Sequence, residues 1–380
     1  CKDSTSKIYV LTIRICGDAK MRVKIGDLTN IKTGKLDANA SSEDGKYPFF
    51  TCSKEPLKIS TYSYDCECVL VAGNGDLNVK YYKGKFDAYQ RTYIIEDNGS
   101  GKLYMPYLYY FMESYIEELR KQAIGGVIKY IKLENLTNAM IELPSIHKQK
   151  VIVEILGKVK IIVNKHMDEI SMLDNLVKAR FVEMFGACKN MLSMNELCSV
   201  ITDGTHQPPK FQKSGIPFIF VSNLANNTVT YDTEKFISQE TYSELYKRTP
   251  IEIGDLILST VGSYGHPAVV VKDKKFLFQR HIAYLKPKCN IVNSFYLHSA
   301  LLAPDGQRQI EGKVKGIAQK TLNLSEIKKI VVPIPPIEEQ NEFERFVHQV
   351  DKSKVVYMYI LKTRKYLMYN SEYREKVNCI

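Results

Sequence analysis

The feature of this sequence that most limits its possible folds is a junction between a proline turn and a long helix, which is present twice. The first copy, "IELPSIHKQKVIVEIL", begins at Ile141, and the second, "VPIPPIEEQNEFERFV", begins at Val332. Each copy places a proline where a fixed φ suits the start of a helix and a glutamine, Gln149 or Gln340, five residues later. Acidic residues near the expected helix start occur only in the second copy, so a charge on the helix dipole is not the shared element. The repeat predicts two long helices, each entered from a similar domain.

Other features recur at a nearly constant spacing. Two glycine loops, at Gly73 and Gly262, are 189 residues apart, and so are two Gln-Arg pairs that begin at Gln90 and Gln279. This period is too long for a solenoid repeat. The chain is therefore interpreted as two copies of a whole domain, each followed by a connector.

The duplication divides the chain into five predicted segments. Each domain is expected to be mixed, with β-rich runs, glycine turns and one short helix, "MPYLYYFMESYIEELR" in the first copy and "SFYLHSALLAPDGQRQI" in the second. In chain order the segments are an N-terminal segment over 1–20, a first β-rich domain over 21–143, a first spacer helix over 144–186, a second β-rich domain over 187–334 and a second spacer helix over 335–380. Because the chain begins with Cys1 rather than Met, we expect the N-terminal segment to be incomplete.

Both spacer helices carry residues spaced mostly by three and four, which is the pattern of a coiled-coil seam. The first seam consists of Ile152, Ile155, Val159, Ile162, His166, Ile170, Leu173, Val177, Phe181 and Met184. The second, which is more polar, consists of Phe343, Val347, Val350, Lys354, Tyr357, Leu361, Arg364 and Met368. We expect the helices to pack on each other. Parallel packing fits the pattern, but antiparallel packing better suits a chain that enters its second domain directly after the first helix.

Composition limits the partners and the compartment. Lys and Arg number 53 against 42 Asp and Glu, and the net charge of +11 suits either a polyanionic partner or a lysine-rich soluble surface. The sequence contains no run of about 18 apolar residues, so we expect no membrane span. The N-terminal segment lacks the pattern of a secretory signal. Nine scattered cysteines, with Cys66 and Cys68 the only close pair, offer no zinc-ligand spacing and suggest reduced thiols in the cytoplasm.

Taken together, these motifs resemble the DNA specificity subunit of type I restriction-modification systems. The resemblance rests on "PIPPIEEQ" before a long helix, "ITDGTHQPPKF", "KTGK", "LDNLVKARFVEMFG" and "GIAQKTLNLSEIKKIVVPIPP". It covers essentially the whole chain, although "IELPSIHKQ" and "AIGGVIKYIKLENL" match only loosely. It implies an α+β fold in which two pseudo-symmetric, mixed β-rich target-recognition domains are separated by two long antiparallel coiled-coil helices. Each domain is expected to read one half of a split asymmetric DNA site, and the helices are expected to fix the spacer.

The same resemblance implies the partners. They are double-stranded DNA, two methyltransferase subunits and restriction or translocase subunits, with AdoMet, ATP and Mg²⁺ held by those subunits and no cofactor in this chain. The residues agree with a non-catalytic role. We find no AdoMet loop, no Asn/Asp-Pro-Pro-aromatic element and no Walker sequence, and "GNGD" follows no clear βαβ unit.

Candidate DNA-contacting residues are polar, aromatic and basic side chains near glycine turns. In the first domain they are Lys32, Lys35, Asn74, Asn78, Lys80, Tyr89 and Arg91. In the second they are Thr205, His206, Lys210, Ser263, Tyr264, His266, Arg280 and His281. Arg and Asn can bond bidentately to guanine and adenine edges, whereas Lys, Ser and Tyr more often hold phosphates. Because the Gln-Arg pair recurs, Arg91 and Arg280 can also be read as scaffold.

The alternative interpretation is a protein-interaction scaffold whose coiled coil is the working surface and whose two β-rich domains bind no DNA. The basic excess and the basic residues at the glycine loops favour DNA. A fused enzyme fragment is a third possibility, which the missing cofactor loops disfavour.

Overall fold

The computed structural model describes residues 21–316 and 319–367, and from residue 355 onward it describes the backbone alone. The predicted N-terminal segment 1–20 and the end of the second spacer helix, 368–380, lie outside the described residues. The chain divides into two compact units. Unit 1 consists of Cys1–Met167 and Tyr359–Ile380, and unit 2 consists of Asp168–Met358. The division passes through both long helices, so each unit contains one β-rich domain and part of each helix.

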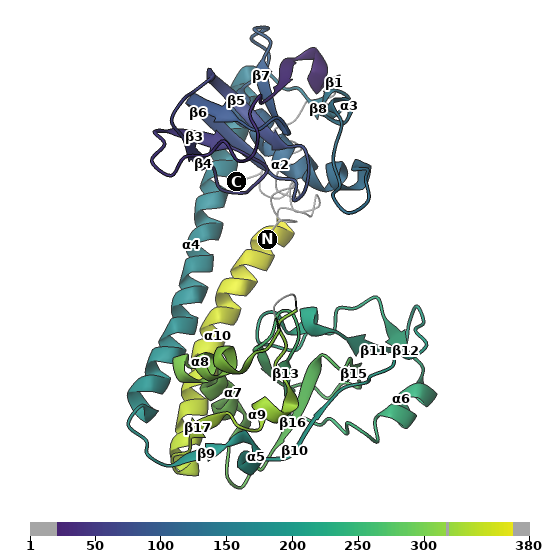
Figure 1. The fold of residues 1–380 in the computed structure, drawn as a ribbon, viewed down its shortest axis with the longest axis vertical. Coiled ribbons are helices and arrows are strands. Elements are labelled where there is room, and N and C mark those ends of the chain that lie inside the picture. The colour runs from purple at the N-terminus through teal and green to yellow at the C-terminus, as the bar shows by residue number, and fades with distance from the viewer. Residues whose placement is uncertain (1–20, 317–318, 368–380) are drawn as a thin grey trace, which may run out of the picture. The chain divides into compact units, whose positions relative to one another are not determined.

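Unit 1 is built on a six-stranded sheet with the strand order β2-β7-β5-β6-β3-β4 (Figure 1). All neighbours in this sheet are antiparallel except β3 and β6. The elements are β1 (Arg22–Lys24), the 3-10 helix η1 (Ile25–Asp27), β2 (Thr29–Thr33), β3 (Tyr47–Phe50), β4 (Leu57–Ile59), β5 (Tyr64–Ala72), β6 (Val79–Ala88), β7 (Thr92–Asp97), α2 (Met105–Gln122), α3 (Leu133–Thr137) and β8 (Met140–Glu142), which pairs with β1.

The core of unit 1 follows from the period of two in β5. Val69 and Val71 face α2 and join its buried residues, among them Leu108 and Met112, in one apolar cluster. Cys68 and Leu70 face the other side of the sheet and belong to a second cluster. The predicted helix "MPYLYYFMESYIEELR" is confirmed as α2.

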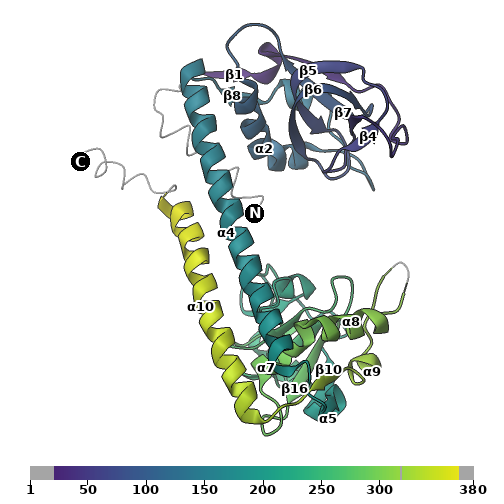
Figure 2. The ribbon, with the colours of Figure 1, turned by 90° about the vertical axis from the view of Figure 1, so that its left-hand side faces the viewer.

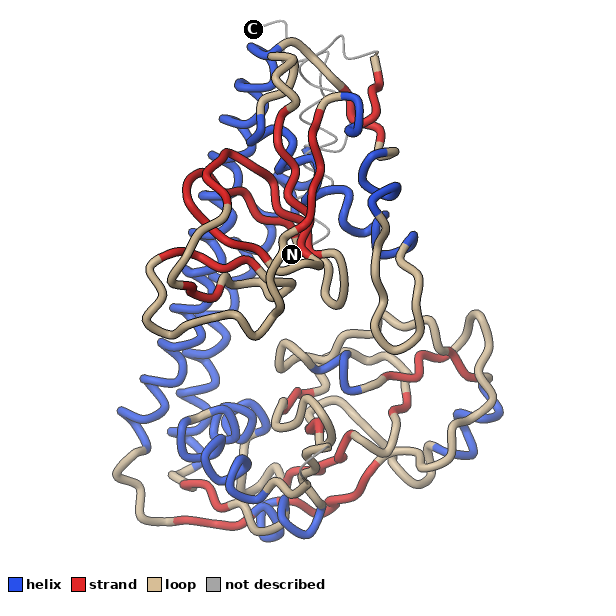
Figure 3. The backbone as a smooth tube through the Cα atoms, turned by 45° about the horizontal axis from the view of Figure 1, so that its top comes forward, coloured by secondary structure: helices blue, strands red, loops and turns tan. Residues whose placement is uncertain are grey.

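Unit 2 contains a four-stranded antiparallel sheet, β10-β16-β13-β14, and a three-stranded sheet, β12-β11-β15. The strands of both units are drawn in red in Figure 3. Its elements are β9 (Met191–Ser193), α5 (Met194–Leu197), β10 (Cys198–Asp203), β11 (Ile216–Ile219), the 3-10 helix η2 (Val221–Leu224), β12 (Phe236–Ile237), α6 (Gln239–Leu245), β13 (Leu256–Ser259), β14 (Pro267–Val269), β15 (Leu277–Phe278), β16 (Ile282–Pro287), α7 (Ser294–Leu302), α8 (Pro304–Lys313), α9 (Leu324–Ile327) and β17 (Val331–Pro333), which pairs with β9.

The prediction of one helix over "SFYLHSALLAPDGQRQI" is wrong, because this segment forms two helices, α7 and α8. The break lies at Ala303, whose φ of −62° and ψ of 156° are extended rather than helical. Pro304 causes it, since a proline pushes the preceding residue out of the helical region.

The two long helices are α4 (Ile146–Phe185) and α10 (Ile337–Leu367). Within unit 2 they lie side by side (Figure 2). The centroid of the Phe343 ring in α10 lies 5.5 Å from the ring centroid of Phe181 and 5.6 Å from that of Phe185. Farther along α10, Lys354 forms an ion pair of 2.7 Å with Asp174. Later residues of α10 therefore meet earlier residues of α4, which confirms antiparallel packing.

Near its start, α4 departs from the predicted seam at Ile155. Ile155 is 37% exposed, whereas Leu156 is 2% exposed and is buried with Ile152 in the main cluster of unit 1. The start of the helix packs on its own domain rather than in a two-helix seam, so the buried residues follow the i, i+4 spacing of a single face.

The duplicated junction has the same structure in both units. The Gln149 side chain is fully buried. Its Oε1 accepts a 2.8 Å hydrogen bond from the backbone N–H of Tyr104, the residue before α2, and its Nε2 donates 2.8 Å bonds to the carbonyls of Lys102 and Pro144. We call Gln149 and its counterpart Gln340 the glutamine clamps.

The clamp of unit 2 makes the equivalent three bonds. Gln340, also fully buried, accepts from the backbone N–H of Asn293 at 2.9 Å and donates to the carbonyls of Ile291 at 3.1 Å and Pro335 at 2.9 Å. Asn293 is the N-cap of α7. The glutamine five residues after the proline therefore joins the start of a spacer helix to the start of a domain helix in both units.

The recurring Gln-Arg pairs are equivalent in the structure only after a shift of one residue. The backbone N–H of Gln90 bonds to the Leu36 carbonyl, and the N–H of Arg280 makes the corresponding bond to Thr205. Gln90 thus corresponds to Arg280, not to Gln279 as the spacing predicted. Strand pairing sets this register, and β6 of unit 1 is replaced in unit 2 by two short strands, β14 and β15, which alters the length of chain between the repeats.

Among the helices of residues 21–316 and 319–367, none combines the length and the apolar character that crossing a bilayer requires.

Replacing Gln340 with Met should weaken unit 2, because Met keeps the length of the side chain but leaves one buried N–H and two buried carbonyls unbonded. We expect a loss of about 2–4 kcal/mol of local stability, measured by hydrogen exchange at the starts of α7 and α10. The matched control is Gln349→Met on the exposed side of α10. Equal protection in both variants would contradict the role of the clamp.

Candidate nucleic-acid interface

Each unit gathers four loop segments at one end of its main sheet. Strand-end surface 1 consists of residues 33–36, 73–75, 89–91 and 129–131. Strand-end surface 2 consists of residues 203–206, 260–262, 279–281 and 319–322. The two surfaces are equivalent in backbone structure.

Corresponding hydrogen bonds hold the two surfaces together. In unit 1, Gly73 N–H donates to the Arg91 carbonyl at 2.7 Å and Gly75 N–H donates to the Lys129 carbonyl at 3.0 Å. In unit 2, the same bonds are made by Thr260 to His281 at 2.9 Å and by Gly262 to Lys320 at 3.1 Å. The glycine loops are therefore equivalent through Gly75 and Gly262, not through Gly73 and Gly262.

Glycine is required at these turns for two reasons. Gly75 and Gly262 have φ values of +67° and +73°, a region that side chains other than glycine rarely adopt. A Cβ on Gly34 would lie 2.1 Å from the Ala88 carbonyl oxygen, and one on Gly204 would lie 2.3 Å from that of Phe278. Gly34 and Gly204 therefore permit close backbone contacts at both surfaces.

Strand-end surface 1 presents unpaired basic groups. Lys35 and Arg91 are exposed and form no ion pair with any residue that the structure describes. Asn74 and Tyr89 lie beside them and are half-buried. These four predicted residues are brought together, with two cations and an amide available to a ligand.

Strand-end surface 2 is arranged around Asp203. Its carboxylate accepts a 2.7 Å hydrogen bond from His206 and pairs at 3.0 Å with Arg248. Arg280 is exposed, and its Nε–H donates to Nε2 of His281 at 3.3 Å. Asp203, Arg280 and His281 line one hollow, while His206 and Arg248 line a second hollow with Thr205.

His281 is held neutral at physiological pH. Burial, and then the adjacent Arg280 guanidinium, lower the pKa of its imidazole below the ordinary value. A neutral ring agrees with its role as acceptor for Arg280. The ring can therefore offer one N–H donor to a ligand.

Three predicted residues of unit 1 are engaged in the domain itself. Lys32 is paired with Glu96 and lies over the Tyr64 ring. Burial lowers the pKa of Lys32, but the hydrogen bond and charge of Glu96, together with nearby Cys66 and Tyr64, raise it overall. Asn78 donates to the Cys52 carbonyl at 2.8 Å, and Lys80 donates to the Asn78 side chain. These side chains support the sheet and the loop after β3.

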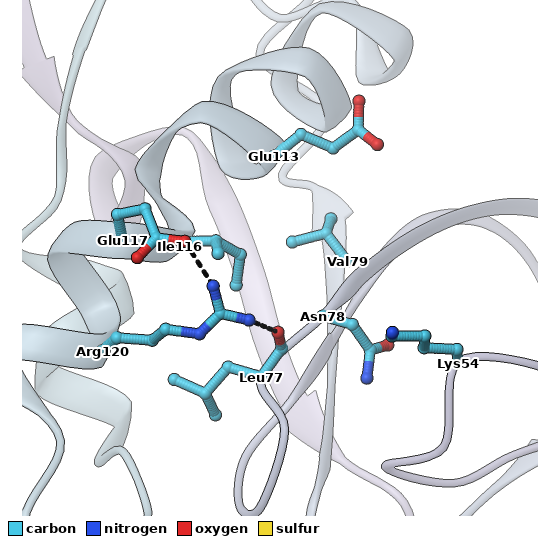
Figure 4. Close-up of a pocket in the computed structure, with 8 residues that line it drawn as sticks. All are labelled: Lys54, Leu77, Asn78, Val79, Glu113, Ile116, Glu117 and Arg120. Carbon is cyan, nitrogen blue, oxygen red and sulfur yellow. Dashed lines mark hydrogen bonds and ion pairs between the residues drawn. The ribbon is translucent and has the colours of Figure 1, made fainter. Parts of the chain in front are cut away.

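Asn78 borders a hollow with mixed charge (Figure 4). Arg120 of α2 reaches across it to the Leu77 carbonyl at 3.0 Å and pairs with Asp76 at 2.9 Å. Glu113 and Glu117 also line it. Two carboxylates beside an already paired arginine make this hollow a poor site for a phosphate backbone.

The remaining predicted residues of unit 2 lie near the turn between β13 and β14 or in the loop after β10. Tyr264 packs against the main cluster of the unit, and the ring of His266 bonds to Asn227 at 2.9 Å. Lys210 and Ser263 are exposed. Tyr264 and His266 are thus turned to the interior.

Sequence reasoning missed Arg248 and the hairpin segments that complete both surfaces. Arg248 follows α6 and reaches Asp203 only through folding, so no local pattern marks it. The segments 129–131 and 319–322 were recognisable as a pair, since "AIGGVIKYI" and "VKGIAQKTL" both precede the duplicated junction at the same distance. Their similarity was too loose to assign them to the interface.

A family model described as "Type I restriction modification DNA specificity domain" matches the chain over residues 18–171 and again over residues 190–356. The two matches cover both repeats. The chain therefore belongs to the family of type I restriction-modification DNA specificity domains, as its motifs predicted.

Two relatives from Escherichia coli agree with this assignment. The specificity subunit of the type I restriction enzyme EcoDI from Escherichia coli is 41% identical over 132 residues, which are 35% of this chain and 29% of that protein. The EcoBI specificity subunit from Escherichia coli is 23% identical over 379 residues, covering 88% of this chain and 79% of that protein. The S subunit of a type I restriction-modification system from M. genitalium has a solved structure with a TM-score of 0.48 and 15% identity, covering 92% of this chain and 93% of the other.

Replacing Arg280 with Ala should raise the pKa of His281 toward the ordinary imidazole value, because a positive neighbour that disfavours protonation is removed. The rise should be partial, since the burial of the ring remains. NMR titration of the protein with labelled histidines measures it. A His281 pKa that stays unchanged or falls would contradict the geometry of this pair.

Proposed function

We propose that this chain is a non-catalytic subunit that recognises a bipartite, asymmetric DNA site, with one half-site read at each strand-end surface. The observation that carries the proposal is the combination of equivalent backbones and different side chains. Gln90 corresponds to Arg280, and Arg91 corresponds to His281, through matching hydrogen bonds. Two surfaces with equivalent backbones but different polar side chains suit the recognition of two different half-sites.

The available side chains have the chemistry for reading base edges. Arg91 and Arg280 can bond bidentately to guanine, and Asn74 to adenine. Asp203 can accept from the amino group of cytosine, and its bonds to His206 and Arg248 orient it for that role. Lys35 and Lys210 suit phosphate contacts, which position the domain without selecting sequence.

The two spacer helices supply the fixed separation that a split site requires. α4 has 40 residues, which corresponds to about 60 Å at 1.5 Å per residue. We propose that this helix and α10 set the unspecified spacer between half-sites.

Chemistry on the DNA is assigned in this proposal to partner subunits. Two methyltransferase subunits would dock on the helix pair and the domains, and restriction or translocase subunits would join them in the cytoplasm, where the chromosomal DNA lies. AdoMet, ATP and Mg²⁺ would belong to those subunits. The names of the relatives support this arrangement, since they describe specificity subunits of restriction enzymes.

The alternative, a scaffold that binds no DNA, is less well supported. Arg91 and Arg280, which form no ion pair with any residue that the structure describes, lie at equivalent ends of the two units beside glycine turns. A scaffold acting through its coiled coil gives no reason to leave cations unpaired at both surfaces.

Arg91→Ala and Arg280→Ala should each relax the reading of one half-site only. We expect about 10- to 100-fold weaker binding, equivalent to roughly 1–3 kcal/mol, to a duplex with the intact site, and a loss of discrimination at a single position. The measurement is competition binding by the chain assembled with its methyltransferase subunits, at fixed salt.

Matched controls are Arg22→Ala in unit 1 and Arg308→Ala in unit 2. Both arginines are exposed and paired to a carboxylate of their own unit, Glu142 or Asp305. If the control variants lose as much discrimination as the test variants, the assignment of the two surfaces is wrong.

A further inference from the structure

Unit 1 carries an exposed apolar hairpin that the proposed base contacts leave unused. The hairpin covers residues 124–130, and we call it the apolar arm. At its tip, Val127 is fully exposed and Ile128 is 63% exposed. Ile124 at its base is 46% exposed. Two neighbouring β-branched side chains placed in water in this way are unfavourable unless something covers them.

The apolar arm is held firmly in its position. Ile124 and Tyr130 exchange two backbone hydrogen bonds, of 3.0 and 2.8 Å, which close the hairpin. The arm is tied to strand-end surface 1 because Gly75 N–H donates to the Lys129 carbonyl at 3.0 Å. Tyr93 adds a hydroxyl bond of 3.1 Å to the Ile131 carbonyl.

The turn at the tip depends on Gly125. Its φ is +118°, and a Cβ there would lie 2.6 Å from the Ile128 carbonyl oxygen. The sequence thus uses a glycine to build a tight turn that projects Val127 and Ile128. The backbone hydrogen bonds of Ile124, Lys129 and Tyr130 fix the base from which this tip projects.

The surroundings of the tip favour DNA over protein as its partner. Lys129 and Lys132 flank it and are exposed without an ion pair to a described residue, and Arg91 lies on the same surface. Two apolar side chains are too few for the buried centre of a protein interface, which usually involves about 20–30 residues on each side. A base step can be opened by one or two apolar side chains, provided that nearby cations hold the phosphates.

Building on the proposed function, we infer that the apolar arm inserts Val127 and Ile128 between stacked base pairs of the duplex beside the half-site read by unit 1. The insertion unstacks that base step and bends the duplex there. The opened step lowers the free energy needed to extrude a neighbouring base, which enzymes that modify a base within a duplex must do. In unit 2 the residues at the corresponding sequence positions include 317–318, which lie outside the described residues, and the inference is confined to unit 1.

The test uses the chain assembled with its methyltransferase subunits and a duplex carrying the split motif that is methylated in cells. A 2-aminopurine is placed in turn at the step flanking each half-site, and its fluorescence reports unstacking. Wild-type complex should raise the signal at one half-site. The double variant Val127→Ser/Ile128→Ser should lose most of that increase and bind about tenfold more weakly.

Salt dependence separates the wedge from its flanking charges. The slope of log affinity against log salt should be unchanged in the double variant, whereas Lys129→Ala should reduce it by about one. The matched control is Leu57→Ser on the edge strand β4, an apolar residue that is also exposed, at 42%. It should leave both fluorescence and affinity as in wild type.

Two outcomes would overturn the inference. One is a double variant with unchanged 2-aminopurine signal and affinity. The other is a double variant that fails to assemble with the methyltransferase subunits, which would assign the arm to a protein contact. Failure of the proposed function has a different signature, because the wild-type complex would then show no preference for the split motif over a scrambled duplex.

Discussion

The arrangement of each unit depends on one buried glutamine side-chain amide. The side-chain amide of each glutamine clamp bonds to three backbone groups, one N–H and two carbonyls. These groups lie where a spacer helix leaves its domain. A buried amide is stable only when its partners are present, so the clamp forms only if the proline turn, the domain helix and the spacer helix are all in place. Because Gln149 and Gln340 make the same bonds, the two helices leave their domains in the same way. A subunit that measures DNA needs this reproducibility.

The two units share these backbone contacts but differ in the side chains that they present at the strand-end surfaces. Glycine turns and matched backbone bonds set the positions of the strand-end surfaces, whereas the side chains presented there differ. Unit 1 offers Lys35 and Arg91, with few internal partners. Unit 2 offers an Asp203 network that orients His206 and Arg248, next to the Arg280–His281 pair. Fold and specificity are thereby separated, since loop residues can change without disturbing the clamps.

Much of the architecture could be predicted from the sequence because it repeats. The duplication gave the two domains, the two long helices and their junctions, and a seam spaced by three and four indicated packing that the Phe181–Phe343 contact confirms. Register was harder. Matching the two Gln-Arg pairs by residue identity was wrong by one residue. Structurally equivalent positions in the two units are defined by strand hydrogen bonds, not by identical residue types. The start of α4 departed from the seam at Ile155, because it packs on its own domain.

The candidate site was predicted less well than the fold. Residues next to glycine turns, such as Arg91 and Arg280, do gather at the strand ends. Lys32, Asn78 and Lys80 are residues of the same types, but their side chains bond within the domain. The sequence shows only the residue type, whereas the neighbours that each side chain meets are set by folding. Arg248 could not be found, because its partner Asp203 is distant in the chain.

The central claim is that one chain with two different readers recognises one split DNA site. The most direct test is methylome sequencing of the source cells with and without the gene for this chain. The account predicts the loss of methylation at a single adenine motif made of two unlike halves and a fixed, unspecified spacer. Loss at one contiguous palindrome, or an unchanged methylome in cells whose partner methyltransferase is expressed and active, would contradict it.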